Sequence, residues 1–398
     1  MIAICDYSIY CIPAGWRTWV YLQVIDESGN HGIAEATESN GFPTGMVSAI
    51  SDSMHHLIGE KLDSPKEVRE LLTKRHRQSL GGLGSKAISA IENACWDLWS
   101  RLENTPIPKL IMGEHQSHAS VFVYWSHCGT SRIRAWNHVQ KPPITTRNDL
   151  QAFSREIAAA DVRAFKTNLF RFSAIDAQVL MPGFGKPNNS TSLIGKEYIS
   201  ELKKNVQALR HSLSGETETI LDLNYNVDLK DFSFFEDALS NLETRWIEID
   251  FDERQPLAKF KSQKSIKICS GENLIGLENY KSIINSDYVD IISIDLLWNG
   301  ISESISIAEE VLKSGKQFTI HNYYSHLSTF MSLTFLSMFK QFELLEFDFD
   351  DVGLRDSIFS FSSPYLPNRG ALQPIVHGLG WNYPELDANK IKEFQLKK

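Results

Sequence analysis

The feature that most constrains the fold is a short unit that recurs three times in the middle of the chain. Each copy is a run of β-favouring residues that ends in a carboxylate, and enough chain for a helix and a loop follows it. The carboxylates are Asp222, Glu248 and Glu272. They lie 26 residues (222 to 248) and 24 residues (248 to 272) apart, which is the period expected of strand–helix units in a parallel barrel.

Carboxylates at the ends of neighbouring parallel strands converge at the mouth of such a barrel. Held close together, they repel one another and raise their own pKa values unless a cation compensates them. A hard divalent cation with oxygen ligands, most simply Mg²⁺, would do this. A single acid at a strand end is more often a helix cap or a solvated loop residue. The repeated position in three consecutive units is what favours a metal site here.

The alternation of strands and helices extends over residues 119–355, which we predict to form the barrel. Eight strand ends can be placed, and eight strands close a barrel that keeps its chemistry at this end. The residues at these ends are Tyr124, Lys166, Asp222, Glu248, Glu272, Asp295, His321 and Glu346. The tail, residues 356–398, is rich in turn residues at its start and is expected to pack back on the first domain.

The first part of the chain, residues 1–118, indicates an α+β domain. Strand-like runs at 3–10 and 18–25 precede a helical region at about 44–80 and a well-patterned helix at 87–102. On that last helix, apolar residues recur at three- and four-residue intervals, so they should face the core. These residues are Ile88, Ile91, Cys95 and Leu98.

The composition of the 398 residues excludes several classes of function. The net charge is −9, which argues against a nucleic-acid partner, and no apolar run approaches membrane-spanning length. The N-terminus lacks the pattern of a signal peptide. The cysteines, odd in number and without paired metal spacing, fit free thiols in a reducing cytoplasm. Cys128 beside His127 is a weak candidate for a nucleophile pair, because sequence neighbours rarely form one.

A histidine and an aspartate extend the series of strand ends. Asp295 and His321 end neighbouring strands, so the carboxylate can accept a hydrogen bond from one imidazole nitrogen and raise the basicity of the other. Lys166 and Asn168 lie across from that imidazole, and a cation there would pair with a substrate carboxylate. From these segments alone, a purely structural role for His321 and for Lys166 is about as well supported as a catalytic one.

Together, a divalent cation, a lysine and a His–Asp pair suit one reaction class, the abstraction of the proton α to a carboxylate. This proton is very weakly acidic, so the enediolate that remains needs positive charge already in place. The Pro-, Gly- and Asn-rich segment 171–192 is either a substrate lid or an oligomer contact, and its composition does not choose between them.

At these residues the chain resembles the enolase superfamily, in its mandelate racemase and muconate-lactonizing enzyme group. The resemblance covers nearly the whole chain, from the turn at 26–35 through the helix at 87–102 to the last barrel strand. It implies an α/β fold: a modified TIM barrel, (β/α)₇β, under an N-terminal α+β capping domain that the C-terminal tail completes. It implies soluble, cytoplasmic homo-oligomers with a small-molecule carboxylate substrate.

The resemblance also assigns roles. Asp222, Glu248 and Glu272 match the ligands of one Mg²⁺ per subunit, and His321 with Asp295 matches the catalytic dyad. Glu346 matches the acid that hydrogen-bonds the substrate carboxylate, and Lys166 matches a catalytic lysine. In the capping domain, two loops at about 12–17 and 41–44 match the specificity loops. The expected substrate contacts are Asn168, Asn224, Arg17 and Phe42.

Three departures from the family pattern bear on the reaction. The second lysine common on the second strand, a base, is here Asn168, which cannot take a proton, so a one-sided reaction led by His321 is favoured. Asp250 stands where the family usually has proline after the fourth strand. The segment 171–192 is longer than expected, which affects the shape of the cavity.

We therefore predict a Mg²⁺-dependent acid-sugar (aldonate or aldarate) dehydratase that gives a 2-keto-3-deoxy sugar acid. His321 would remove the α-proton, and its imidazolium would then help the 3-hydroxyl group to leave. An epimerase, racemase or cycloisomerase that uses the same enediolate is the nearest alternative. A non-catalytic binding protein is a further alternative, against which the complete ligand set argues.

Overall fold

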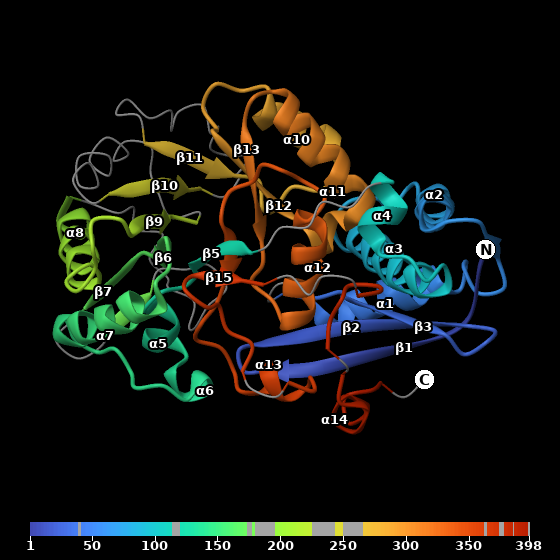
Figure 1. The fold of residues 1–398 in the computed structure, drawn as a ribbon, viewed down its shortest axis with the longest axis horizontal. Coiled ribbons are helices and arrows are strands. Elements are labelled where there is room, and N and C mark those ends of the chain that lie inside the picture. The colour runs from blue at the N-terminus through green and yellow to red at the C-terminus, as the bar shows by residue number, and fades with distance from the viewer. Residues whose placement is uncertain are drawn as a thin grey trace.

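Two sheets of different kind organise the chain, one antiparallel and one parallel (Figure 1). The computed structural model describes residues 1–38, 41–113, 120–172, 177–179, 196–224, 243–249, 266–361, 364–373, 378–384 and 386–396. The described residues bury an extended apolar cluster that runs through both parts of the molecule and a second, smaller one formed by residues of the barrel strands. None of the described helices is both long and apolar enough to cross a membrane.

The antiparallel sheet belongs to the N-terminal capping part and has the strand order β3-β2-β1-β4. Its strands are β1 (Ile2–Ala14), β2 (Arg17–Asp26), β3 (His31–Glu35) and β4 (Lys61–Leu62). Three helices accompany it: α1 (Pro43–Met54), α2 (Pro65–Arg75) and α3 (Gly82–Leu102). The predicted helical region at 44–80 is present as two helices, α1 and α2, with the short strand β4 between them. Gly59 with φ +86° ends that helical stretch and leads into β4, and Ser64, whose hydroxyl accepts the Glu67 N–H, caps a new helix.

Helix α3 confirms the predicted apolar face, because Ile88, Ile91, Cys95 and Leu98 are all buried. Its polar side chains dock the cap on the barrel helix α11 (Leu296–Lys313), and the two helices lie side by side in Figure 1. The Asn93 Oδ1 atom accepts the Ile301 N–H at 2.9 Å. Helix α11 kinks at Gly300, where φ is +73° and a Cβ atom would lie 2.6 Å from Glu92 Oε2. A glycine is therefore required where cap and barrel meet.

The parallel strands form the barrel in the order β13-β12-β11-β10-β9-β6-β5-β14. The sheet curves until its ends meet: the Glu343 N–H donates to Phe318 O at 2.7 Å, and the Thr319 hydroxyl donates to Leu344 O at 2.7 Å. The strands are β5 (Val121–Trp125), β6 (Ala164–Asn168), β9 (Glu218–Asp222), β10 (Thr244–Glu248), β11 (Lys267–Ser270), β12 (Ile291–Asp295), β13 (Gln317–His321) and β14 (Leu345–Phe347).

Every predicted strand-end residue lies within two residues of the end of its strand. Glu272 is the one that lies beyond its strand, because β11 ends at Ser270 and Gly271, with φ +119°, begins a turn. Between and after the strands lie α4 (Ile107–Met112), α5 (Thr130–Arg134), α6 (Trp136–Val139), α7 (Arg147–Ala160), α8 (Lys196–Leu209), α10 (Leu277–Ile284) and α12 (His326–Leu336). A small hairpin, β7 (Phe170–Phe172) with β8 (Ala177–Val179), follows β6.

The C-terminal tail contains α13 (Leu354–Ser357), β15 (Ala371–Leu372) and α14 (Ala388–Lys392). Strand β15 pairs antiparallel with β5, and the last described residues add to the cap: the Cys11 N–H donates to Phe394 O, and the Leu396 N–H donates to Ile9 O, each at 2.9 Å. The predicted fold class, a capped barrel completed by the tail, is confirmed. Most of the segment 171–192, and Asp250, lie outside the described residues.

Candidate functional site

The predicted ligand carboxylates gather at one end of the barrel. Asp222 and Glu248 are buried and stand opposite each other in the register of β9 and β10. Burial raises the pKa of both, and repulsion from the carboxylate of Glu272 raises it further; Asp222 adds to the rise at Glu248. Three acids from three consecutive strands therefore share one electrostatic environment, as the sequence predicted, and Lys166 lowers the pKa of Asp222 and Glu248 against the effect of burial.

Lys166 is the cation that compensates these acids in the structure. Its Nζ atom lies 2.8 Å from Glu346 Oε1, 3.3 Å from Glu248 and 3.9 Å from Asp222. The surrounding carboxylates raise its pKa well above the ordinary value against the effect of burial, so it keeps its proton. Within the described residues, no three His, Cys, Asp or Glu side chains stand at the spacing that would enclose an ion.

His321 and Asp295 form the predicted pair. The His321 Nδ1 atom lies 2.8 Å from Asp295 Oδ2, and its Nε2 atom lies 3.7 Å from Glu272 Oε2. Strands β12 and β13 place Asp295 directly opposite His321. Burial alone would lower the pKa of His321, but Glu272 and the hydrogen bond to Asp295 outweigh it and raise the pKa to about 10. The imidazole thus lies between its orienting acid and a candidate metal ligand.

Glu346 lies on the last barrel strand, β14, and both of its oxygens are held by residues that follow the two neighbouring strands. The Ser126 hydroxyl donates to Oε1 at 2.5 Å, and the Asn322 N–H donates to Oε2 at 2.9 Å. Lys166 and His321 keep its pKa below the ordinary value although the side chain is buried. The carboxylate is therefore charged and fixed in orientation.

The two predicted asparagines join the site as supports of Asp222. Asn168 Nδ2 donates to Asp222 Oδ2 at 2.9 Å, and its Oδ1 accepts the Thr130 hydroxyl proton at 3.2 Å. The N–H of Asn224, which has a left-handed backbone with φ +49°, donates to Asp222 Oδ1 at 2.9 Å. Both oxygens of Asp222 are thus engaged by amide donors, which fixes its rotamer.

The two predicted contacts from the cap behave differently from each other. Arg17, at the tight turn between β1 and β2, is buried and pairs with Asp351 at 2.7 Å, beside the ring of Tyr323. Phe42 stands at the start of α1 with 68% of its surface exposed. The structure therefore brings Arg17 to the meeting of cap and barrel loops, and it does not bring Phe42 into the buried cluster.

Three neighbours of the cluster were missed by reasoning from the sequence: His127, Asp348 and Tyr324. His127 Nδ1 lies 3.1 Å from both oxygens of Asp348, and the Tyr324 hydroxyl donates to Asp295 Oδ2 at 2.5 Å. The same rule that selected the other strand ends would have found His127, which lies two residues beyond β5. Cys128, in contrast, is buried, and burial raises its pKa well above the ordinary value, which disfavours the thiolate that a nucleophile needs.

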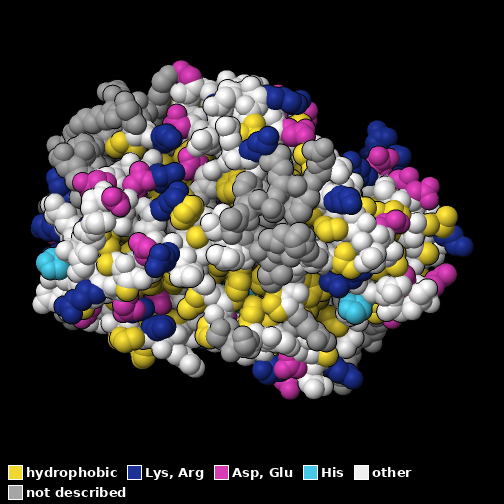
Figure 2. Space-filling model, in the orientation of Figure 1, with side chains coloured by type: hydrophobic (Ala, Val, Ile, Leu, Met, Phe, Trp, Pro, Cys, Tyr) yellow, Lys and Arg dark blue, Asp and Glu magenta, His cyan; other side chains and the backbone are white. Residues whose placement is uncertain are grey.

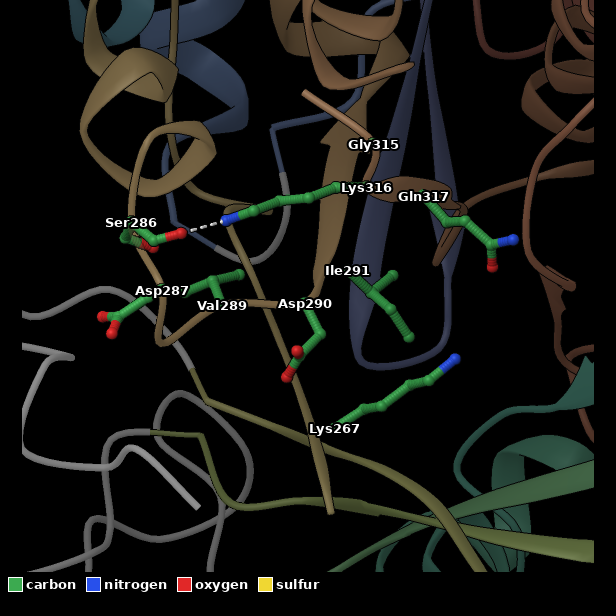
Figure 3. A pocket seen from close by; sticks show the side chains of 9 residues that line it. All are labelled: Lys267, Ser286, Asp287, Val289, Asp290, Ile291, Gly315, Lys316 and Gln317. Carbon is green, nitrogen blue, oxygen red and sulfur yellow. Dashed lines mark hydrogen bonds between the residues drawn. The ribbon is translucent and has the colours of Figure 1, made fainter. Parts of the chain in front are cut away.

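A hollow of about 350 Å³ lies at the opposite end of the barrel, where β11, β12 and β13 begin (Figure 3). Lys316 crosses it and donates to Ser286 O at 2.6 Å and Ile283 O at 3.0 Å. These bonds satisfy carbonyl groups at the C-terminal end of α10. The hollow is therefore separate from the His321–Asp295 pair, which lies at the other end of the strands. On the described part of the face in Figure 2, Lys and Arg side chains are interspersed with Asp and Glu, so no extended basic patch forms there.

Comparison with protein families matches two models to this chain. A model described as "Enolase C-terminal domain-like" matches residues 149–385. A model of the mandelate racemase / muconate lactonizing enzyme N-terminal domain matches residues 14–112. The two together cover the cap and most of the barrel.

The names of similar proteins describe two different reactions. A D-gluconate/D-galactonate dehydratase of Picrophilus torridus is 22% identical over 324 residues, which are 79% of this chain and 74% of the relative. A solved structure of a Burkholderia xenovorans protein has a TM-score of 0.90 and is 26% identical, over 99% of this chain and 96% of that one. That protein, assigned as an L-alanine-DL-glutamate epimerase without an established activity, is bound to magnesium and fumarate. A dehydratase-like structure from Mesorhizobium loti, 19% identical with a TM-score of 0.82, shares the fold.

Proposed function

Because this chain belongs to the enolase superfamily, in its mandelate racemase and muconate lactonizing enzyme group, we propose that it is a Mg²⁺-dependent acid-sugar dehydratase. The observation that carries the proposal is the buried cluster in which the His321–Asp295 pair faces Glu272, among Asp222, Glu248 and Glu346. Such a cluster suits removal of the proton α to a carboxylate, which needs one oriented base and strong positive charge beside the developing anion.

Asp222, Glu248 and Glu272 would hold one Mg²⁺ per subunit, because they offer the hard carboxylate oxygens that this ion prefers and share one negative charge cluster. In the structure burial raises the pKa values of Asp222 and Glu248 and Lys166 lowers them, and no three such side chains of the described residues stand at the spacing that encloses an ion, so binding would draw the three acids together. When bound, the ion would supply the positive charge that stabilises the substrate's enediolate oxygens. It would also offset the charge of Glu272, which holds the pKa of His321 at about 10, and so return the imidazole toward the neutral form that a base needs.

The proposed base is the Nε2 atom of His321. Asp295 accepts a hydrogen bond from His321 Nδ1 at 2.8 Å. This bond fixes the tautomer and turns Nε2 toward the cluster. The ring is largely buried, so the proton moves in a site from which most water is excluded. Removal of the C2 proton of an aldonate or aldarate by this atom, followed by loss of the 3-hydroxyl group, gives a 2-keto-3-deoxy acid and water.

Lys166 and Glu346 are proposed to hold the substrate carboxylate. Lys166 stays protonated and lies within 4 Å of three acids, so it can share its charge with an incoming carboxylate. Glu346 is charged in the structure and can accept a hydrogen bond from a substrate oxygen. The names of relatives, D-gluconate and D-galactonate dehydratase among them, support a sugar acid as substrate.

An epimerase is the second candidate, and the structure of the epimerase-assigned relative is the observation that favours it. Asn168 argues against a second base at this position, because an amide takes no proton, and its two amide atoms contact Thr130 and Asp222 instead. Water loss therefore remains the preferred outcome of the shared enediolate.

The test is a mass-spectrometric screen of D-gluconate, D-galactonate and further aldonates and aldarates with Mg²⁺. The wild type is expected to release one water from at least one acid, and His321→Asn is expected to release none while Mg²⁺ binding, measured by calorimetry, is kept. Deuterium entering the substrate from D₂O without water loss would replace the dehydratase proposal with an epimerase.

A further inference from the structure

A second histidine–aspartate pair, His127 with Asp348, stands at the same end of the barrel as His321 with Asp295. In each pair the Nδ1 atom of the histidine meets an aspartate at the end of the neighbouring strand: β12 beside β13 for His321, and β14 beside β5 for His127. The distances are 3.1 Å to each Asp348 oxygen and 2.8 Å to Asp295. In both rings the aspartate accepts a hydrogen bond from Nδ1, which fixes the tautomer, so Nε2 is the nitrogen that can exchange protons.

The two pairs flank one carboxylate, that of Glu346. The residue before His127 is Ser126, whose hydroxyl donates to Oε1, and the residue after His321 is Asn322, whose N–H donates to Oε2. Each oxygen of Glu346 is thus tied to the chain beside one histidine. If Glu346 holds a substrate oxygen, as proposed above, an imidazole stands on either side of the bound acid.

His127 is buried, and its surroundings hold both its ring and its backbone in place. The ring is 5% exposed and lies against Tyr323, with centroids 4.7 Å apart. Its backbone is left-handed, with φ +46°, a costly conformation for a residue with a side chain, and bonds from the Thr130 hydroxyl and the Ser131 N–H to its carbonyl hold it. Against the effect of burial, Lys166, His321 and His127 lower the pKa of Glu346, so the charge of His127 acts on the acid cluster.

Dehydration needs a proton donor as well as a base, because hydroxide is a poor leaving group. Among the other polar side chains of the cluster, Asn168 carries no exchangeable acid proton, and Lys166 holds its proton tightly among three carboxylates. His127 has the acid–base chemistry that both of these side chains lack.

We propose that His127 is a second proton-transfer group, which donates the proton that leaves with the 3-hydroxyl oxygen. This inference rests on the dehydratase function. His321 Nε2 takes the C2 proton and the C–H electron pair enters the enediolate. As the enediolate collapses, the C3–O bond breaks and its oxygen takes the Nε2 proton of His127, leaving as water. The enol then gains a proton at C3 and loses its hydroxyl proton, while His127 regains a proton and His321 releases one.

The experiment separates the two proton transfers with His127→Asn, because asparagine tolerates a left-handed backbone and its amide can still donate to Asp348. D-gluconate and D-galactonate are incubated with the Mg²⁺-loaded enzyme in D₂O. The variant is expected to exchange the α-proton within about threefold of the wild-type rate and to lose water about 100-fold more slowly. His321→Asn is expected to lose both reactions.

A leaving group that needs no proton gives the second arm. The 3-deoxy-3-fluoro analogue of the acid that the wild type dehydrates is expected to lose fluoride at near wild-type rate with His127→Asn. His326→Gln, at another buried acid-paired histidine, is the matched control and should dehydrate normally. Equal dehydration by His127→Asn, or loss of fluoride release with Mg²⁺ binding and melting temperature intact, overturns the inference. A wild type that releases no water from any acid overturns the dehydratase function itself.

Discussion

Two histidines five positions apart in the chain, His321 and His326, show how the same side chain acquires opposite properties. Both are buried and each contacts an aspartate at 2.8–2.9 Å. His321 ends β13 among carboxylates, and its pKa is raised to about 10. His326 begins α12 among the rings of Phe347, Phe361 and Tyr365, and burial, with the nearby Arg355, lowers its pKa to about 4.

The difference teaches that an acid partner does not by itself make a histidine a proton carrier. Around His326 the burial among aromatic rings, together with the nearby Arg355, outweighs the contact with Asp356, so the neutral form is favoured and the ring serves packing. Around His321 several carboxylates favour the protonated ring. The ring can therefore gain a proton, and it can lose that proton when a cation offsets the carboxylate charge. Proximity in the sequence is irrelevant, because the end of a strand and the first turn of a helix face different parts of the fold.

The largest expected effect compares the two histidines in catalysis. His321→Asn should lower α-proton exchange by about 10³-fold, roughly 4 kcal/mol of transition-state stabilisation, because the amide can replace Nδ1 toward Asp295 but cannot accept the proton. His326→Gln should stay within about threefold of wild type. Exchange is measured in D₂O by mass spectrometry, with Mg²⁺ binding as a check of the site. Similar losses in both variants would mean that the two histidines do not differ in role.

The regular alternation of strand-like and helix-like segments was sufficient to predict the strand ends. A strand presents alternate residues to one face, and parallel strands align their ends. His321 and Asp295 could be paired for the same reason. The pair of His127 with Asp348 could not, because it joins residues 221 apart through the closure of the barrel. Lys166 was expected at a substrate carboxylate, and its contacts with Glu248 and Glu346 depend on distances across the barrel that no local pattern encodes.

A smaller effect is expected in stability. The pKa of His326 is about 4 in the folded chain and about 6.5 when unfolded, so below pH 6.5 the unfolded chain binds a proton that the folded chain refuses. The free energy of unfolding should therefore fall by about 3 kcal/mol from this group as pH drops from 7 to 4. Urea unfolding of the wild type and of His326→Gln at both pH values isolates the contribution of His326 to the free energy of unfolding. Parallel losses in the two proteins would show that His326 is not held neutral.

The smallest effect concerns the tyrosine beside each histidine. The Tyr324 hydroxyl donates to Asp295 Oδ2, the oxygen that also receives the His321 Nδ1 proton, whereas the Tyr365 hydroxyl, near His326, contacts the Gln373 carbonyl at 3.5 Å. Tyr324→Phe should lower kcat about tenfold, some 1.4 kcal/mol, with KM nearly unchanged, because Asp295 loses a donor that fixes its direction toward His321. Tyr365→Phe removes a comparable hydroxyl without touching the dyad and should leave kcat unchanged. If Tyr324→Phe instead changed KM alone, or matched Tyr365→Phe, the orientation of Asp295 would not depend on this hydrogen bond, and the carboxylate would be positioned by its bond to the Trp298 N–H at 2.8 Å.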